Sequence, residues 1–114
     1  MIEITYDFKG TELFVKGHAN SAPMGEDLVC ATVSGLTVAL ACTLKDAKRQ
    51  EMLDDLTIDL EDGNAHIKAV PKKGFERDVM IMFSTVFNGY DALSISFKDY
   101  VSFKPRVGIR ESTN

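Results

Sequence analysis

A histidine and a cysteine lie twelve positions apart near the start of the chain, at His18 and Cys30. His18 ends an alternating apolar segment, and Cys30 follows Asp27 at the start of a longer one. Because aspartate is a favoured N-cap residue, the pattern predicts that Cys30 lies in the first turn of a helix, where free backbone N–H groups favour a thiolate. A thiolate beside a histidine is the minimum requirement for nucleophilic catalysis by cysteine. The alternative is that Cys30 is a small buried apolar residue, which is the commoner role of such a cysteine.

Three neighbouring residues could support this pair. The segment 19–27 is rich in turn-forming residues, so it predicts a loop in which Gly25 could be the hinge of a lid. Asp27 either caps the helix or orients the histidine, and capping is the simpler role. Ser34 lies one helical turn beyond Cys30 on the same helix face, where it could hydrogen-bond either near the site or to its own helix backbone.

The remaining cysteine, histidine and acidic pairs have simpler interpretations. Cys42 is twelve residues beyond Cys30, which is ~18 Å along a continuous helix, so a disulfide and a shared zinc ion are both excluded. We expect Cys42 in the core, His66 solvated on the polar face of a strand, and acidic pairs such as Glu61 and Asp62 at solvated edges. No spacing typical of zinc or phosphate binding occurs, so we expect no metal and no cofactor.

Composition narrows the class of protein. The chain has 114 residues, enough for one domain with its own core, and a net charge of -4 with a pI near 5.1. An acidic chain does not favour nucleic-acid binding, which needs a basic face. The apolar segment from Leu28 to Leu44 is interrupted by polar residues and too short to span a membrane, and the N-terminus alternates like a strand. We therefore expect a cytoplasmic protein with reduced thiols and no membrane partner.

The hydrophobic pattern predicts seven elements in the order ββ-α-ββ-α-β. Alternation predicts strands, a 3.6-residue period predicts helices, and Asp62-Gly63 predicts a hairpin turn. The expected ranges are strands over 2–8 and 13–18, a helix from 28, a hairpin over 56–69, a helix over 75–93 and a strand over 100–104. This order favours an α+β fold of two layers, one sheet packed against two helices. We expect a single domain over 1–104 and a polar tail over 105–114.

The segment from Gly17 to Ser34 resembles the motif of the ribosomal-processing cysteine protease family called Prp. The family motif is Gly-His-Ala, a glycine-containing loop, an Asp, two aliphatic residues, a Cys, two small residues and an aliphatic-Ser. The order of elements and the length also agree, so the resemblance covers about residues 1–104. The matching residues are Gly17, His18, Ala19, Gly25, Asp27, Leu28, Val29, Cys30, Ala31, Thr32, Val33 and Ser34.

The resemblance implies a bacterial endopeptidase that removes a short N-terminal extension from a large-subunit ribosomal protein. It implies that Cys30 is the nucleophile and His18 its base, that Gly17, Gly25, Asp27 and Ser34 support them, and that the protein is a homodimer. It also implies cleavage after paired aromatic residues in a basic segment. Two alternatives from other classes remain: a non-catalytic domain that holds a basic peptide in the same groove, and a thiol peroxidase or redox sensor that uses Cys30.

Overall fold

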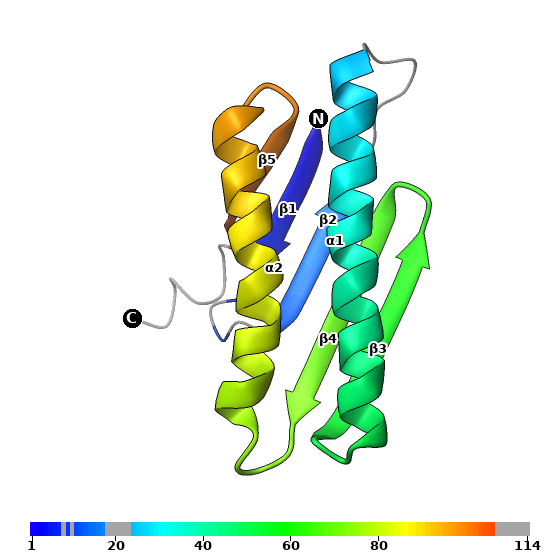
Figure 1. Cartoon of the computed structure of the whole chain (residues 1–114), viewed down its shortest axis with the longest axis vertical. Coiled ribbons are helices and arrows are strands. Elements are labelled where there is room, and N and C mark those ends of the chain that lie inside the picture. The colour runs from blue at the N-terminus through cyan, green and yellow to red at the C-terminus, as the bar shows by residue number, and fades with distance from the viewer. Residues whose placement is uncertain (8, 10, 18–23, 107–114) are drawn as a thin grey trace.

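The structure is a computed structural model that describes residues 1–7, 9, 11–17 and 24–106, with the backbone alone over 24–27. The observed order of elements is ββαββαβ, which confirms the predicted order (Figure 1). The elements are β1 (Ile2–Tyr6), β2 (Glu12–Lys16), α1 (Met24–Arg49), β3 (Leu53–Glu61), β4 (Asn64–Pro71), α2 (Glu76–Ser96) and β5 (Val101–Pro105).

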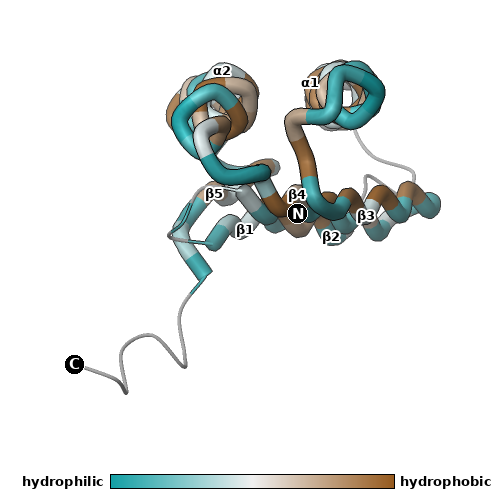
Figure 2. The backbone as a smooth tube through the Cα atoms, turned by 90° about the horizontal axis from the view of Figure 1, so that it is seen from below, coloured by the Kyte–Doolittle hydropathy of each residue, from teal (hydrophilic) through white to brown (hydrophobic). Residues whose placement is uncertain are grey.

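The fold has two layers, with both helices on one face of a five-stranded sheet (Figure 2). The strand order is β3-β4-β2-β1-β5, and every neighbouring pair is antiparallel except β1 and β5, which run parallel. The predicted α+β class and its two-layer packing are therefore confirmed. Among the described residues, no helix lies on the other face of the sheet (Figure 2).

Alternation along the strands explains which face is covered. Ile4 pairs with Val15 across β1 and β2, and Leu13 pairs with Ile67 across β2 and β4. All four side chains are buried, and successive residues in a strand point to opposite faces. The central strands thus present a continuous apolar surface to the helices. The hairpin predicted around Asp62-Gly63 is also confirmed as β3 and β4.

Helix α1 lies along this surface and forms much of the core. Its buried side chains recur at helical spacing: Val29, Val33, Thr37, Leu40, Ala41, Leu44 and Ala47. By length and composition the segment Leu28–Arg49, with a mean hydropathy of 1.7, is long enough to cross a membrane, so the expectation that it is too short was wrong. Its buried stripe packs on the sheet and α2, and 33% of the apolar window is buried.

One buried hydrogen bond joins the two helices. The Thr37 hydroxyl on α1 lies 2.6 Å from the Tyr90 hydroxyl on α2, and it also donates to the Val33 carbonyl oxygen at 2.7 Å. Tyr90 is fully buried and Thr37 is 5% exposed. Burial raises the pKa of Tyr90 to about 12, and the hydrogen bond to Thr37 acts in the opposite direction. The core therefore favours the neutral form of Tyr90.

The C-terminal boundary differs from the predicted one. The last strand extends to Pro105, and Arg106 is attached to the sheet. The Arg106 N–H donates to the Tyr6 carbonyl oxygen at 2.7 Å, and its guanidinium carbon lies 3.8 Å from the centre of the Phe14 ring. The rest of the predicted tail, 107–114, lies outside the described residues, and the division into a domain and a tail stays a prediction.

We expect the free energy of unfolding to fall as the pH rises from 10 to 12. The unfolded chain loses the Tyr90 proton near pH 10, but the folded chain keeps it to about pH 12. Unfolding therefore releases a proton in this window, and the loss reaches at most about 2 to 3 kcal/mol. Urea unfolding at pH 8, 10 and 11.5 measures it.

Tyr90→Phe is the control for this prediction. At neutral pH the variant should lose only about 1 kcal/mol, because Thr37 keeps its bond to the Val33 carbonyl. Above pH 10, the free energy of unfolding of the variant should then fall less steeply with pH than that of the wild type. Equal slopes would show that other groups cause the alkaline unfolding.

Candidate active site

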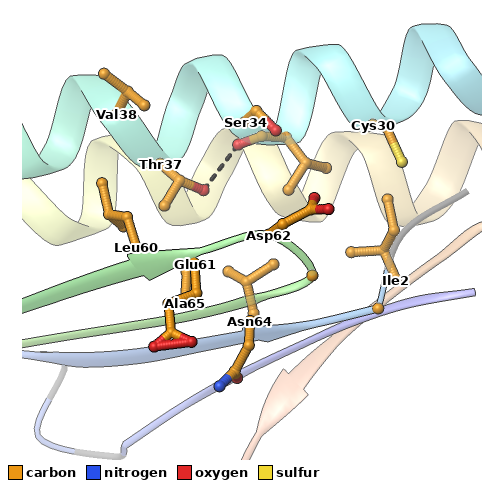
Figure 3. Close-up of a pocket in the computed structure, with 14 residues that line it drawn as sticks. Ile2, Cys30, Ser34, Thr37, Val38, Leu60, Glu61, Asp62, Asn64 and Ala65 are labelled. Carbon is orange, nitrogen blue, oxygen red and sulfur yellow. Dashed lines mark hydrogen bonds between the residues drawn. The ribbon is translucent and has the colours of Figure 1, made fainter.

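A pocket of about 480 Å³ opens between α1 and the end of the sheet where β2 stops and β4 starts (Figure 3). Its volume is within the range of about 300 to 1,000 Å³ that is typical of ligand sites. Its walls come from the start of β1, the end of β2, one stripe of α1 and the tip of the β3–β4 hairpin. The lining residues are Ile2, Val15, Gly17, Cys30, Val33, Ser34, Thr37, Val38, Leu60, Glu61, Asp62, Gly63, Asn64 and Ala65.

Cys30 is positioned by the helical period of α1. Val33 and Ser34 lie three and four residues beyond Cys30. Thr37 and Val38 lie three and four residues beyond Ser34, so all five share one stripe of the helix. Cys30 is half-buried, and its thiol points from α1 toward the strand end that carries Ile2 (Figure 3). The sequence therefore folds so that the candidate nucleophile lies at the wall of a pocket.

Helix α1 begins four residues earlier than predicted. Its first residue is Met24, so Asp27 lies inside the helix instead of capping it. Cys30 is consequently the seventh helical residue and lies in the second turn, beyond the free N–H groups of the first. Acidic residues are favoured in the first turn as well as at the cap, so the sequence pattern did not separate these positions.

The structure brings some of the predicted site residues together. Gly17, Cys30 and Ser34 line the same pocket. In the described part of the chain the Ser34 hydroxyl has no hydrogen-bond partner, so neither role suggested for it is seen. Gly25 lies in the first turn of α1 and not in a loop, which contradicts its assignment as a loop hinge. His18 and the rest of the predicted lid, 19–23, lie outside the described residues.

Gly17 is confined by its surroundings. Its backbone has φ +97°, a conformation that side chains disfavour, and a Cβ at this position would overlap the Met1 carbonyl oxygen. Its N–H donates to the Gly63 carbonyl oxygen at 3.0 Å, which ties the end of β2 to the hairpin tip. Glycine at position 17 therefore lets the N-terminus, β2 and the hairpin meet at the edge of the pocket.

Gly17→Ala should lower the free energy of unfolding by more than Gly74→Ala. Gly74 has nearly the same φ, +98°, but a Cβ there has nothing within 4 Å. Gly74→Ala thus measures the backbone strain alone, about 1 to 2 kcal/mol. Gly17→Ala adds the overlap with Met1, and urea unfolding measures the difference. Equal losses in the two variants would refute the close packing at Gly17.

The second cysteine is exposed, so the expectation that Cys42 lies in the core was wrong. The buried stripe of α1 passes through Leu40, Ala41 and Leu44, which leaves position 42 on the outer face. Both cysteines are described, and neither forms a disulfide, as the spacing predicted. Only Cys30 is next to the pocket.

His66 lies on the sheet face without helices, as predicted, but it is not simply solvated. Its ring stacks on Phe14 with centroids 4.4 Å apart and planes at 9°, and its Nε2 lies 2.7 Å from Oε2 of Glu12. Both contacts of the His66 ring, with Phe14 and with Glu12, therefore lie away from the pocket. The pocket residues that the sequence analysis missed are those of the hairpin tip, Asp62 above all, which had been assigned to a solvated edge.

The fold and the pocket define a two-layer α+β domain with a thiol at the wall of a ligand-sized site. The family model for the cysteine protease Prp matches residues 1–102. The chain therefore belongs to the cysteine protease Prp family, a family of peptidases, as the motif from Gly17 to Ser34 indicated. No curated protein is similar enough to the chain to count as a match.

Solved structures share this fold over nearly the whole chain. SMU.848 from Streptococcus mutans is 26% identical, with a TM-score of 0.70, and the match covers 95% of this chain and 96% of that one. Two structures of an essential ribosomal processing protease Prp from S. aureus match over 92% of this chain and 97% of theirs. The complex with a covalently linked product peptide is 20% identical with a TM-score of 0.65, and the complex with a substrate peptide is 18% identical with a TM-score of 0.68.

Proposed function

We propose that this protein is a cysteine endopeptidase that removes a short N-terminal extension from a large-subunit ribosomal protein. The observation that carries the proposal is the Cys30 thiol at the wall of a ligand-sized pocket, in a chain of the cysteine protease Prp family. The S. aureus proteins of the same fold, a ribosomal processing protease solved with peptides, support the choice of substrate.

The proposed mechanism uses Cys30 and His18. The Cys30 thiolate attacks the carbonyl carbon of the scissile peptide bond, and His18 holds the proton taken from the thiol. The C–N bond then breaks, His18 gives that proton to the leaving amine, and the new N-terminus departs while a thioester remains on Cys30. Water, deprotonated by His18, hydrolyses the thioester and restores the thiol. Gly17, one residue before His18, anchors this end of β2 to the hairpin.

Mass spectrometry of a peptide that spans the N-terminal extension of the host's own ribosomal protein tests this proposal. The reduced wild type should cut one bond, after the paired aromatic residues. Cys30→Ala and His18→Ala should each lower the rate at least about 10³-fold, because the nucleophile and its base act as one unit.

Cys42→Ser is the matched control, since Cys42 is an exposed thiol on the same helix and outside the pocket. It should cut at the wild-type rate. A peptide that binds but stays intact would favour the alternative, a non-catalytic peptide-binding domain. Peroxide consumption that needs Cys30 but not His18 would favour a thiol peroxidase.

We also infer a cytoplasmic homodimer in which the outer faces of two α1 helices meet. The segment from Leu28 to Leu44 carries no charged residue, although Leu28 is 64% exposed. Two copies that each carry a net charge of -4 repel one another least across an uncharged face. A two-fold interface pairs the same surface from both subunits, and an uncharged face is compatible with itself.

Sedimentation equilibrium tests this interface with Ala39→Glu, which places a carboxylate on the outer face of α1. Ala39 is exposed and does not line the pocket. In the dimer the variant brings two like charges together, so the dissociation constant should rise at least about tenfold. A dimer of unchanged strength would place the interface elsewhere, and a monomeric wild type would refute the homodimer.

A further inference from the structure

We propose that Asp62 determines the specificity of the pocket by binding one positively charged side chain, lysine or arginine, of the peptide. This inference rests on the proposed function, because it concerns the same site. Asp62 lies at the tip of the β3–β4 hairpin, directly before Gly63, and it lines the pocket that contains Cys30. Figure 3 shows its carboxylate pointing from the hairpin toward α1.

The charge of this pocket has one sign. Among the described residues, its lining includes Glu61 and Asp62 but no lysine or arginine. The two acidic side chains differ in direction: Figure 3 shows the Glu61 carboxylate on the side of the hairpin away from α1. Glu61 thus contributes to the pocket mainly through its backbone, and Asp62 is the carboxylate that faces the space where a peptide would lie.

The surroundings of Asp62 suit a long side chain with a charged end. Apolar side chains form the neighbouring wall and floor, among them Ile2, Val15 and Val33. The methylene stem of a lysine or arginine can lie on such a surface while its charged end reaches a polar group. Within the described part of the chain no cation forms an ion pair with Asp62, so its carboxylate is available for a charge-assisted hydrogen bond. The Asp62 carboxylate would repel an acidic side chain of the peptide at this position.

The two groups of the site are held by separate, ordered elements. Cys30 lies on α1, and the hairpin tip is tied to β2 by the bond from the Gly17 N–H to the Gly63 carbonyl oxygen. The separation between the thiol and the Asp62 carboxylate is therefore set by the fold. It follows that the preference for a cation should occur at one position of the peptide relative to the cleaved bond, and not along its whole length.

A lysine scan tests this preference. The parent is the peptide of the host's ribosomal extension with every lysine and arginine replaced by glutamine, and each member of the series restores one lysine. For the wild type, one position should raise kcat/KM about tenfold, the effect of one exposed charge-assisted hydrogen bond. Acetylation of that lysine should remove the gain, and so should Asp62→Asn.

Asp59→Asn is the matched control, because it removes the same charge from the same hairpin at an exposed position that does not line the pocket. Asp59 pairs with His66, which lies on the sheet face without helices. This variant should keep the gain at the preferred position. Gains spread over many positions, or equal losses in the two variants, would overturn the proposal and leave only general attraction to an acidic protein.

Measurements of peptide binding distinguish two outcomes: failure of the Asp62 subsite and failure of the proposed endopeptidase activity. If the wild type cleaves no member of the series, the endopeptidase activity fails, and fluorescein-labelled peptides of the same series are then titrated with Cys30→Ala. Tighter binding at one lysine position that is lost in Cys30→Ala/Asp62→Asn would still support the Asp62 subsite. Equal affinities for all members would overturn it.

Discussion

The apolar core holds α1 on the sheet, and one buried hydrogen bond, between Thr37 and Tyr90, fixes its register against α2. Apolar contacts are not directional, so they alone would let a helix rotate or slide at low cost. A buried hydroxyl must have a partner, and only one placement of α1 against α2 brings these two hydroxyls to 2.6 Å. Thr37 also lines the pocket, two turns beyond Cys30 on the same stripe. Cys30 therefore lies on the same stripe of α1 as the hydroxyl that fixes the register of the helix.

Most of the fold could be predicted from the local pattern of polar and apolar residues. The errors occurred where polar and apolar positions do not alternate clearly. Alternation identified the strands, and Asp62-Gly63 identified the hairpin, because both signals depend on neighbouring residues. Helix α1 was harder, since its outer face between Leu28 and Leu44 is as uncharged as its inner face. The sequence therefore did not show that Cys42 faces outward. The strand order was also beyond local pattern, because the parallel pairing of β1 with β5 joins opposite ends of the chain.

Some residues of the candidate site could likewise be predicted from local pattern, and others could not. Gly17, Cys30 and Ser34 were predictable because they belong to one motif on one connection between a strand and a helix. Asp62 reaches the pocket only because β4 pairs with β2 in the register that places Asn64 opposite Lys16. That register is set by apolar side chains on the inner face, such as Leu13 opposite Ile67, and not by any residue of the motif. A residue at the tip of a hairpin has no local signal that distinguishes a pocket wall from a solvated turn.

The pocket also depends on strand β5, although no residue of that strand lines it. Ile2 forms part of the floor, and its N–H donates to the carbonyl oxygen of Tyr100 at 2.8 Å, just before β5 begins. Met1 packs against Gly17 at the other side of the same strand end. Since β1 is held between β2 and β5, loss of the last strand would remove the pairing of Ile2 with Val101. A motif confined to positions 17–34 thus needs nearly the whole chain to form a site, which agrees with a family match that extends over residues 1–102.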